Sequence, residues 1–203
     1  MKNSIRILTI GLICLPLITI GLEVNKICYF YDTLLIEWQK SCLNNLNNEI
    51  SYNKIKNDTL LIDLFTHCKE QIKNTNFIKE YFNTKSSEII LQSKESFFIM
   101  RKITGEQVKI EYYILTFENN DFYLYQSFDK ENYKKSIINK SIFYSTDSLF
   151  RKLEITQCQT YDIGLIIISH FNNNNSEISS KVFPIICSLQ LGDILKIISC
   201  KIW

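Results

Sequence analysis

Histidines and cysteines are the side chains most often used for nucleophilic and metal chemistry, and this sequence has two histidines, His67 and His170, beside seven cysteines. His67 adjoins Cys68, and a histidine next to a thiol could form a nucleophilic pair. In the helix expected there, neighbouring side chains point about 100° apart, so the two cannot face each other. We expect His170 to be exposed at the end of a strand. Because two lone histidines are also too few for most zinc sites, we predict neither a catalytic residue nor a metal site.

Carboxylates are numerous but scattered. Asp32 and Glu37 flank the apolar stripe of the first predicted helix, while Glu118 and Asp121 bracket a predicted turn. Such pairs usually lie on solvated faces, and none is singled out as a glycosidase-like couple. The sequence contains no glycine-rich phosphate loop, G-x-S-x-G or H-E-x-x-H motif. We therefore predict no cofactor and no enzymatic activity, and a carboxylate-dependent hydrolase is the least favoured function.

The N-terminus has the pattern of a secretory signal peptide, with two basic residues before an apolar run at 7–20. Thr19 and Gly21 match the small-residue pattern of a cleavage site and predict cleavage after Gly21. The apolar run is shorter than the roughly 20 residues that a membrane-spanning helix needs, which disfavours an uncleaved anchor. The sequence thus predicts a signal peptide at 1–21, a single secreted domain at 22–203, and no membrane span after cleavage.

Loss of Cys14 with the signal peptide leaves six cysteines, and an even number in an oxidising compartment predicts three disulfides. The six are Cys28, Cys42, Cys68, Cys158, Cys187 and Cys200. No pair has the C-x-x-C spacing of a zinc knuckle or a redox site. A bridge from Cys68 to Cys42 and one from Cys68 to Cys28 are both compatible with a pair of antiparallel helices.

The last two cysteines lie in a predicted terminal hairpin that turns at Gly192-Asp193. In this register Cys187 and Cys200 are diagonal to each other, which is unfavourable for a direct bridge because a disulfide requires a short Cβ–Cβ separation. Cys158 and Cys28 are the favoured partners for them. These thiols are expected to hold the terminal strand in place without taking part in chemistry.

Composition narrows the choice of partner. Hydrophobic residues are 46% and charged residues 22% of the chain, as in a globular protein. The net charge of +2 is too small to indicate nucleic acid or a membrane surface as a partner. Three N-x-[ST] sequons, at Asn57, Asn139 and Asn174, lie in predicted loops. An asparagine-rich chain also forms sequons by accident, so glycosylation is expected there only in a eukaryotic host.

Hydrophobic spacing predicts helices first. Residues 25–47 have the period of an amphipathic helix, and a second helix is capped by Asn57 or Asp58. A break near Asn74 precedes a third segment that ends at about residue 83. The apolar stripe of the second helix consists of Leu61, Leu64, Phe65, Cys68 and Ile72.

From residue 87 the period becomes that of extended chain. The candidate strands are 88–92, 96–103, 107–118, 121–128, 149–157, 160–170, 181–190 and 194–202, with 141–145 as a further candidate. The clearest hairpin turns at Asn119-Asn120, which sets Phe117 opposite Phe122. The same register sets Leu115 opposite Leu124 and Ile114 opposite Tyr125.

Helices followed by a run of antiparallel strands indicate an α+β fold. We predict N-terminal helices, at about 25–83, packed on a curved antiparallel β-sheet at about 87–202. The alternative is an up-and-down, lipocalin-like β-barrel with the helices outside. Some fifty residues of helical pattern are more than a barrel lid needs, which favours the first architecture.

One face of the 107–128 hairpin is apolar, and the other carries Tyr112, Ile114, Tyr123 and Tyr125. Tyrosine suits any half-exposed strand, but it also suits a ligand-binding surface, because it combines a stiff apolar ring with a hydroxyl. We expect a secreted, non-enzymatic binding protein that holds an apolar or amphipathic small molecule, or an extracellular partner protein. The alternative is a secreted effector that acts through its surface.

Overall fold

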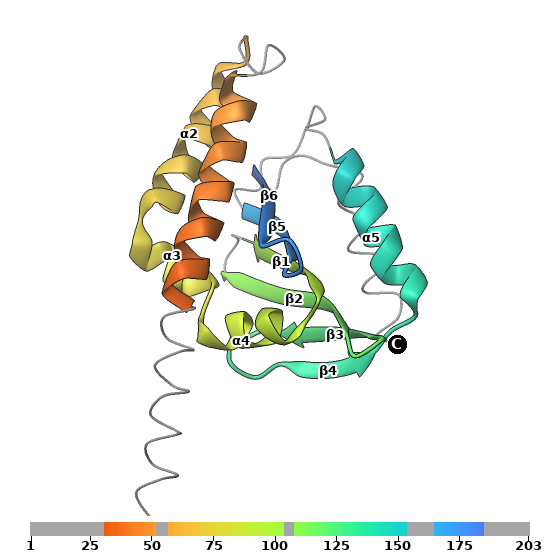
Figure 1. Ribbon diagram of the computed structural model, residues 1–203. Coiled ribbons are helices and arrows are strands. Elements are labelled where there is room, and N and C mark those ends of the chain that lie inside the picture. Colours follow the sequence, from red (N-terminus) through yellow and green to blue (C-terminus); the bar gives the residue numbers. More distant parts are fainter. Residues whose placement is uncertain (1–30, 52–56, 104–107, 154–164, 185–203) are drawn as a thin grey trace, which may run out of the picture.

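The computed structural model describes residues 31–51, 57–103, 108–153 and 165–184. Residues 31–51 are helical and form the first helix (orange-red in Figure 1). Four further helices are α2 (Thr59–Lys73), α3 (Thr75–Tyr81), α4 (Thr84–Gln92) and α5 (Lys140–Lys152). The strands are β1 (Glu95–Ile103), β2 (Lys109–Glu118), β3 (Asp121–Ser127), β4 (Lys134–Ile137), β5 (Leu165–Asn172) and β6 (Glu177–Pro184).

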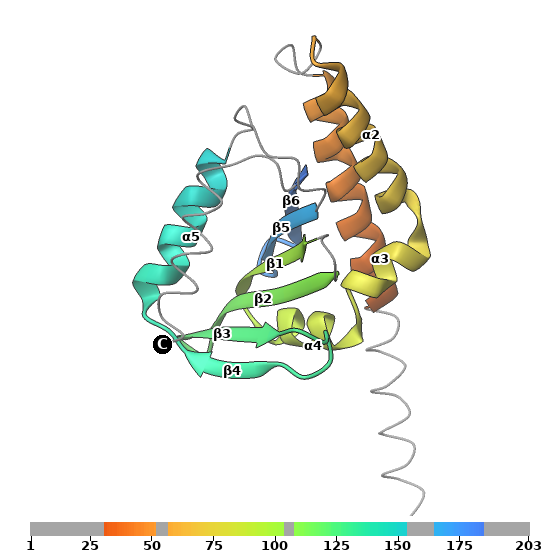
Figure 2. The same ribbon diagram turned by 180° about the vertical axis from the view of Figure 1, so that it is seen from behind.

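The six strands form one antiparallel sheet in the order β4-β3-β2-β1-β5-β6. Strands β4 and β6 lie at its two edges, so the sheet is open and is not closed into a barrel. The first helix and α2 to α4 lie on one side, and α5 lies on the other side, as Figures 1 and 2 show from opposite directions. The predicted α+β fold with helices on a curved sheet is confirmed, and the lipocalin-like alternative is wrong.

The larger core lies between the N-terminal helices and the sheet. Trp38 of the first helix stacks on Phe82 with ring centroids 4.8 Å apart, and both rings are nearly perpendicular to the Phe98 ring of β1, at 89° and 85°. The Trp38 Nε1–H donates a hydrogen bond of 2.7 Å to Ser169 Oγ on β5. Since a buried indole N–H needs an acceptor, this bond fixes the first helix over the centre of the sheet.

The smaller core lies under α5 on the opposite face. Phe143 and Phe150 of α5 approach the Phe97 ring at 5.2 and 5.8 Å between centroids. Alternate residues of β1 therefore serve the two cores, because successive side chains of a strand point to opposite faces. The central strands are accordingly apolar on both faces.

Asparagine side chains begin three of the helices. Asn74 accepts from the amides of Asn76 and Phe77, and so produces the predicted break and starts α3. Asn83 caps α4 and Asn139 caps α5 in the same way. These two caps explain errors in the predicted strands, because 88–92 and 141–145 are helical, as is the start of 149–157. In each case the N-cap and the helical spacing outweigh the β-propensity of isoleucine and phenylalanine.

The predicted β2–β3 hairpin is confirmed with its register, in which Phe117 pairs with Phe122 and Leu115 with Leu124. Strand β4 was missed, because its residues are all exposed and show no alternation. Residues 107, 154–157, 160–164, 185–190 and 194–202 of the predicted strands lie outside the described residues. So does the predicted signal peptide.

The Asn119-Asn120 turn supplies a test of the hairpin. Both residues have positive φ, 47° and 73°, as a type I′ turn requires. We expect Asn120→Gly to leave the free energy of unfolding within about 0.5 kcal/mol, because glycine adopts this conformation freely. Asn120→Val should lower it by about 1–2 kcal/mol, because a β-branched residue is strained there. Urea unfolding measures both, and equal effects of the two variants would contradict the turn geometry.

Candidate functional site

The hairpin face predicted to contact a ligand turns toward the N-terminal helices. Tyr112 and Ile114 are buried in the helix–sheet core. Tyr125 is also buried, and Tyr123 is half-buried. The whole predicted set therefore belongs to the helix–sheet core, and the two residues from β3 also contact a polar cluster beside the sheet edge at β4.

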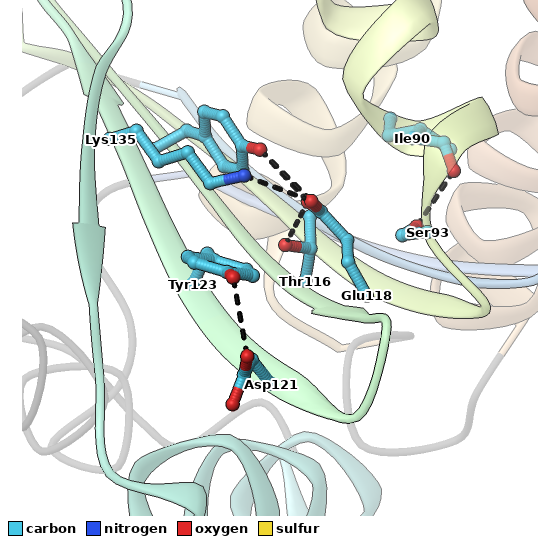
Figure 3. Close-up of polar contacts among 8 residues, drawn as sticks. Ile90, Ser93, Thr116, Glu118, Asp121, Tyr123 and Lys135 are labelled. Atoms are coloured by element: carbon cyan, nitrogen blue, oxygen red, sulfur yellow. Dashed lines mark hydrogen bonds and ion pairs between the residues drawn. The ribbon is translucent and has the colours of Figure 1, made fainter.

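Glu118, the last residue of β2, is the centre of that cluster (Figure 3). Its carboxylate is buried, with 8% of the side chain exposed. Oε1 accepts hydrogen bonds from Thr116 Oγ1 at 2.5 Å and from the Tyr125 hydroxyl at 2.9 Å. Oε2 accepts from Lys135 Nζ of β4 at 3.0 Å. The cluster thus joins β4 to β2 across the intervening strand β3.

Lys135 is also held by aromatic rings. Its ammonium lies 3.7 Å from the centroid of the Tyr123 ring and 5.0 Å from that of Tyr125, which is cation–π geometry. Burial lowers the pKa of Lys135, but its hydrogen bonds with Tyr125 and Glu118 outweigh this effect, so the pKa is raised. Burial raises the pKa of Tyr125, which keeps this hydroxyl protonated as a donor.

This arrangement favours a structural role for Glu118 over proton transfer. Both carboxylate oxygens already accept hydrogen bonds, so Glu118 has little capacity left for a substrate proton. The Asp121 carboxylate lies apart from it and accepts from the Tyr123 hydroxyl at 3.5 Å (Figure 3). Among the described residues, no group of three or more histidines, cysteines and carboxylates could hold a metal ion.

The two histidines lie far from this cluster in the sequence and make their own contacts. His67 is exposed, with Nε2 at 2.8 Å from Gln71 Nε2, whereas the adjacent Cys68 is buried. The expectation that His170 is exposed is wrong: only 14% of its side chain is exposed. Its Nε2 lies 2.6 Å from Glu95 Oε1, and its ring stacks on Phe97. It is half-buried because strand alternation points it toward α5.

Cys42 and Cys68, on the first helix and α2, are buried free thiols, and they do not bond to each other. Burial raises the pKa of each thiol to about 12, so both are protonated and unreactive near neutral pH. The other four cysteines of the predicted disulfide set, Cys28, Cys158, Cys187 and Cys200, lie outside the described residues, and their pairing stays a prediction.

The three predicted glycosylation sites are all accessible. Asn57, Asn139 and Asn174 are exposed, and Asn139 caps α5 two residues after the end of β4. The Asn139 side-chain oxygen accepts from the Ser141 amide, which leaves the side-chain nitrogen available. Glycosylation at these sites stays a prediction.

The edge at β4 is the most exposed part of this region. All four residues of β4 are exposed, and Ile137 has 76% of its surface accessible. Tyr144 of α5 is 56% exposed, with its ring 5.7 Å from that of Phe122, which lies on β3 next to β4. The residues of β4 show no alternation that would predict a strand, because the strand depends on its contacts with Glu118 and with β3.

A double-mutant cycle tests the Glu118–Lys135 clamp. We expect Glu118→Gln and Lys135→Met each to lower the free energy of unfolding by about 1–2 kcal/mol, which is less than for a fully buried pair because 43% of Lys135 is exposed. The double variant should lose less than the sum of the two. Lys134→Met is the matched control and should change stability by no more than about 0.5 kcal/mol. Equal losses for both lysine variants would argue against the clamp.

The buried thiols predict instability at high pH. The pKa of Cys42 rises from its ordinary 9.0 to about 12 on folding, so the folded chain binds the proton more tightly. The resulting stabilisation is complete below pH 9 and is lost as the pH rises toward 12. In this window Cys42→Val should reduce the slope of unfolding free energy against pH by up to about 1.4 kcal/mol per unit. Urea unfolding under reducing conditions measures this slope. Unfolding of the same variant at pH 7 gives the change in stability that is due to packing alone. An unchanged slope would contradict the prediction.

No protein-family model matches this chain, and searches of curated proteins and of solved structures also found no match. None of the helices in the described part of the chain is long and apolar enough to cross a membrane. A function for the protein therefore has to be argued from its own residues.

Proposed function

We propose that this is a secreted, non-enzymatic protein that binds an extracellular partner protein through the sheet edge at β4. The exposure of β4 is the observation that carries the proposal: each of its four residues is accessible, although the strand belongs to the sheet. A rigid strand with accessible side chains and backbone is a common docking element in protein recognition.

Exposed apolar side chains beside β4 support this assignment. Ile137 is on the strand itself, and Tyr144 contacts Phe122 on the neighbouring strand. The two side chains lie on opposite faces of the sheet beside this edge, because Ile137 pairs with Tyr123 whereas Tyr144 contacts Phe122. Aromatic and aliphatic side chains are common in interaction surfaces. The signal-peptide pattern and the accessible sequons support an extracellular setting.

The rival functions have weaker support from the described residues. The tyrosine-rich face predicted to hold a small ligand is covered by side chains of the N-terminal helices, with Trp38 and Phe82 packed over the centre of the sheet. A hydrolase would need a carboxylate free to exchange a proton, whereas Glu118 is saturated by donors.

Site-specific photo-crosslinking tests the proposal. In one variant the full chain carries the photo-crosslinker p-benzoylphenylalanine at position 137 of β4. The control variant carries it at position 36 of the first helix, where Ile36 is also exposed, at 50%. We expect one discrete adduct with an extracellular protein from position 137 and none from position 36. No adduct from position 137, or the same adducts from both, would contradict the proposed function. N-terminal sequencing of the protein from the medium checks its secretion and should begin at Leu22.

A further inference from the structure

We infer that the partner binds β4 by strand addition, and that it supplies an extended acidic segment that becomes a seventh strand of the sheet. This inference rests on the proposed function and specifies the chemistry of the partner. It follows from the direction of the backbone groups of β4, from the cover on the opposite edge, and from the charge along the strand.

The backbone of β4 presents hydrogen-bonding groups outward. The Ile138 amide donates to Phe122 O at 2.9 Å, so the backbone of residue 138 points toward β3. Along an antiparallel ladder the direction alternates with each residue. The amides and carbonyls of Lys135 and Ile137 therefore point away from the sheet, and no strand in the described ranges pairs with that side of β4.

The opposite edge is covered by the protein itself. Asn45 Oδ1 of the first helix accepts from the outward Val182 amide of β6 at 2.8 Å. The Ser41 hydroxyl of the same helix donates to Ile178 O at 3.4 Å. Side chains thus occupy two of the outward backbone groups of β6, as natural proteins do to block an unwanted strand. Across the described part of the chain, β4 has no equivalent cover, and this difference singles it out.

The edge is also held ready for binding. Lys135 is fixed by Glu118 and by the rings of Tyr123 and Tyr125, so β4 is attached to the sheet by more than its four residues of ladder. A docking strand whose position is fixed beforehand loses less conformational entropy when a partner binds.

The charge of β4 favours an acidic partner strand. Both ionic side chains of β4 are lysines. The charge of Lys135 is matched by Glu118, whereas Lys134, on the opposite face of the strand, forms no ion pair among the described residues. A carboxylate directly across from Lys134 would form a favourable cross-strand pair. A second copy of β4 offers only lysines, and residues 185–203 carry one aspartate and two lysines, so neither supplies the complementary charge.

Peptide binding tests strand addition. The probe is a fluorescein-labelled nine-residue peptide of alternating glutamate and valine, and the matched probe replaces glutamate with lysine. The protein would carry Ser141→Ala, which removes the sequon beside β4 and leaves the Asn139 cap intact. We expect the acidic peptide to bind at least about tenfold more tightly than the basic one, the size of one charge-assisted contact. Equal affinities would overturn the acidic assignment.

Two substitutions at one position separate the backbone from the side chain. Ile137→Pro removes an outward amide and leaves the bonds to β3 intact, whereas Ile137→Thr keeps the amide. We expect proline to weaken binding of the acidic peptide at least about tenfold and threonine by less than about threefold. Amide spectra of the other strands check that both variants are folded. Equal weakening by the two variants would overturn strand addition.

Hydrogen exchange of the free protein distinguishes the other occupants. The Lys135 and Ile137 amides should exchange quickly in the monomer and slowly with the acidic peptide. Protection in the free monomer would show that the protein's own chain covers the edge, and protection that depends on protein concentration would show a second copy; either overturns the inference. With the crosslinker moved to position 144, an adduct that survives Ile137→Pro would overturn strand addition alone and leave the proposed function standing.

Discussion

The sheet has apolar side chains on both faces, and this constraint determines the rest of the structure. In β1, four consecutive residues from Phe97 to Met100 are fully buried, two on each face. A strand of this kind must be covered on both sides, because leaving either face in water would forfeit the main driving force for folding. The N-terminal helices cover one face and α5 covers the other. Because both faces are needed for stability, the edges are the parts of the sheet that can bind a partner.

The contacts at the two edge strands of the sheet, β6 and β4, differ. On β6, side chains of the first helix bind two outward backbone groups, so the helix that covers the face also contacts the edge. On β4, the stabilising contacts come from the inner side, through the Lys135 ammonium and the Glu118 carboxylate. An ion pair of this type adds little net stability, but it fixes the position of the strand, because a displaced Lys135 would leave a buried carboxylate without its cation. The asymmetry between the edges is the physical basis for assigning an interaction to β4.

The sequence predicts those parts of the fold in which local chemistry and periodicity agree. Asn119-Asn120 between alternating strands is sufficient for the β2–β3 hairpin, and the stripe Phe65, Cys68 and Ile72 is sufficient for α2. Helices α4 and α5 do not follow from residue propensity, because both contain residues with high β-propensity and begin at an asparagine cap that outweighs it. Strand β4 could not be predicted locally, because its partner carboxylate lies 17 residues earlier in the chain. The candidate site was predicted only in Tyr123 and Tyr125, whose surroundings depend on that same contact.

The stacking of Trp38 on Phe82 and its bond to Ser169 have a spectroscopic consequence. Trp38 is the sole tryptophan in the described part of the chain, and its indole is fully shielded from water. Its emission should therefore lie at short wavelength while the first helix covers the sheet, and should move to longer wavelength when that helix separates. The same helix contacts the β6 edge, so the contribution of Trp38 to the emission reports whether the helix still covers that side of the sheet.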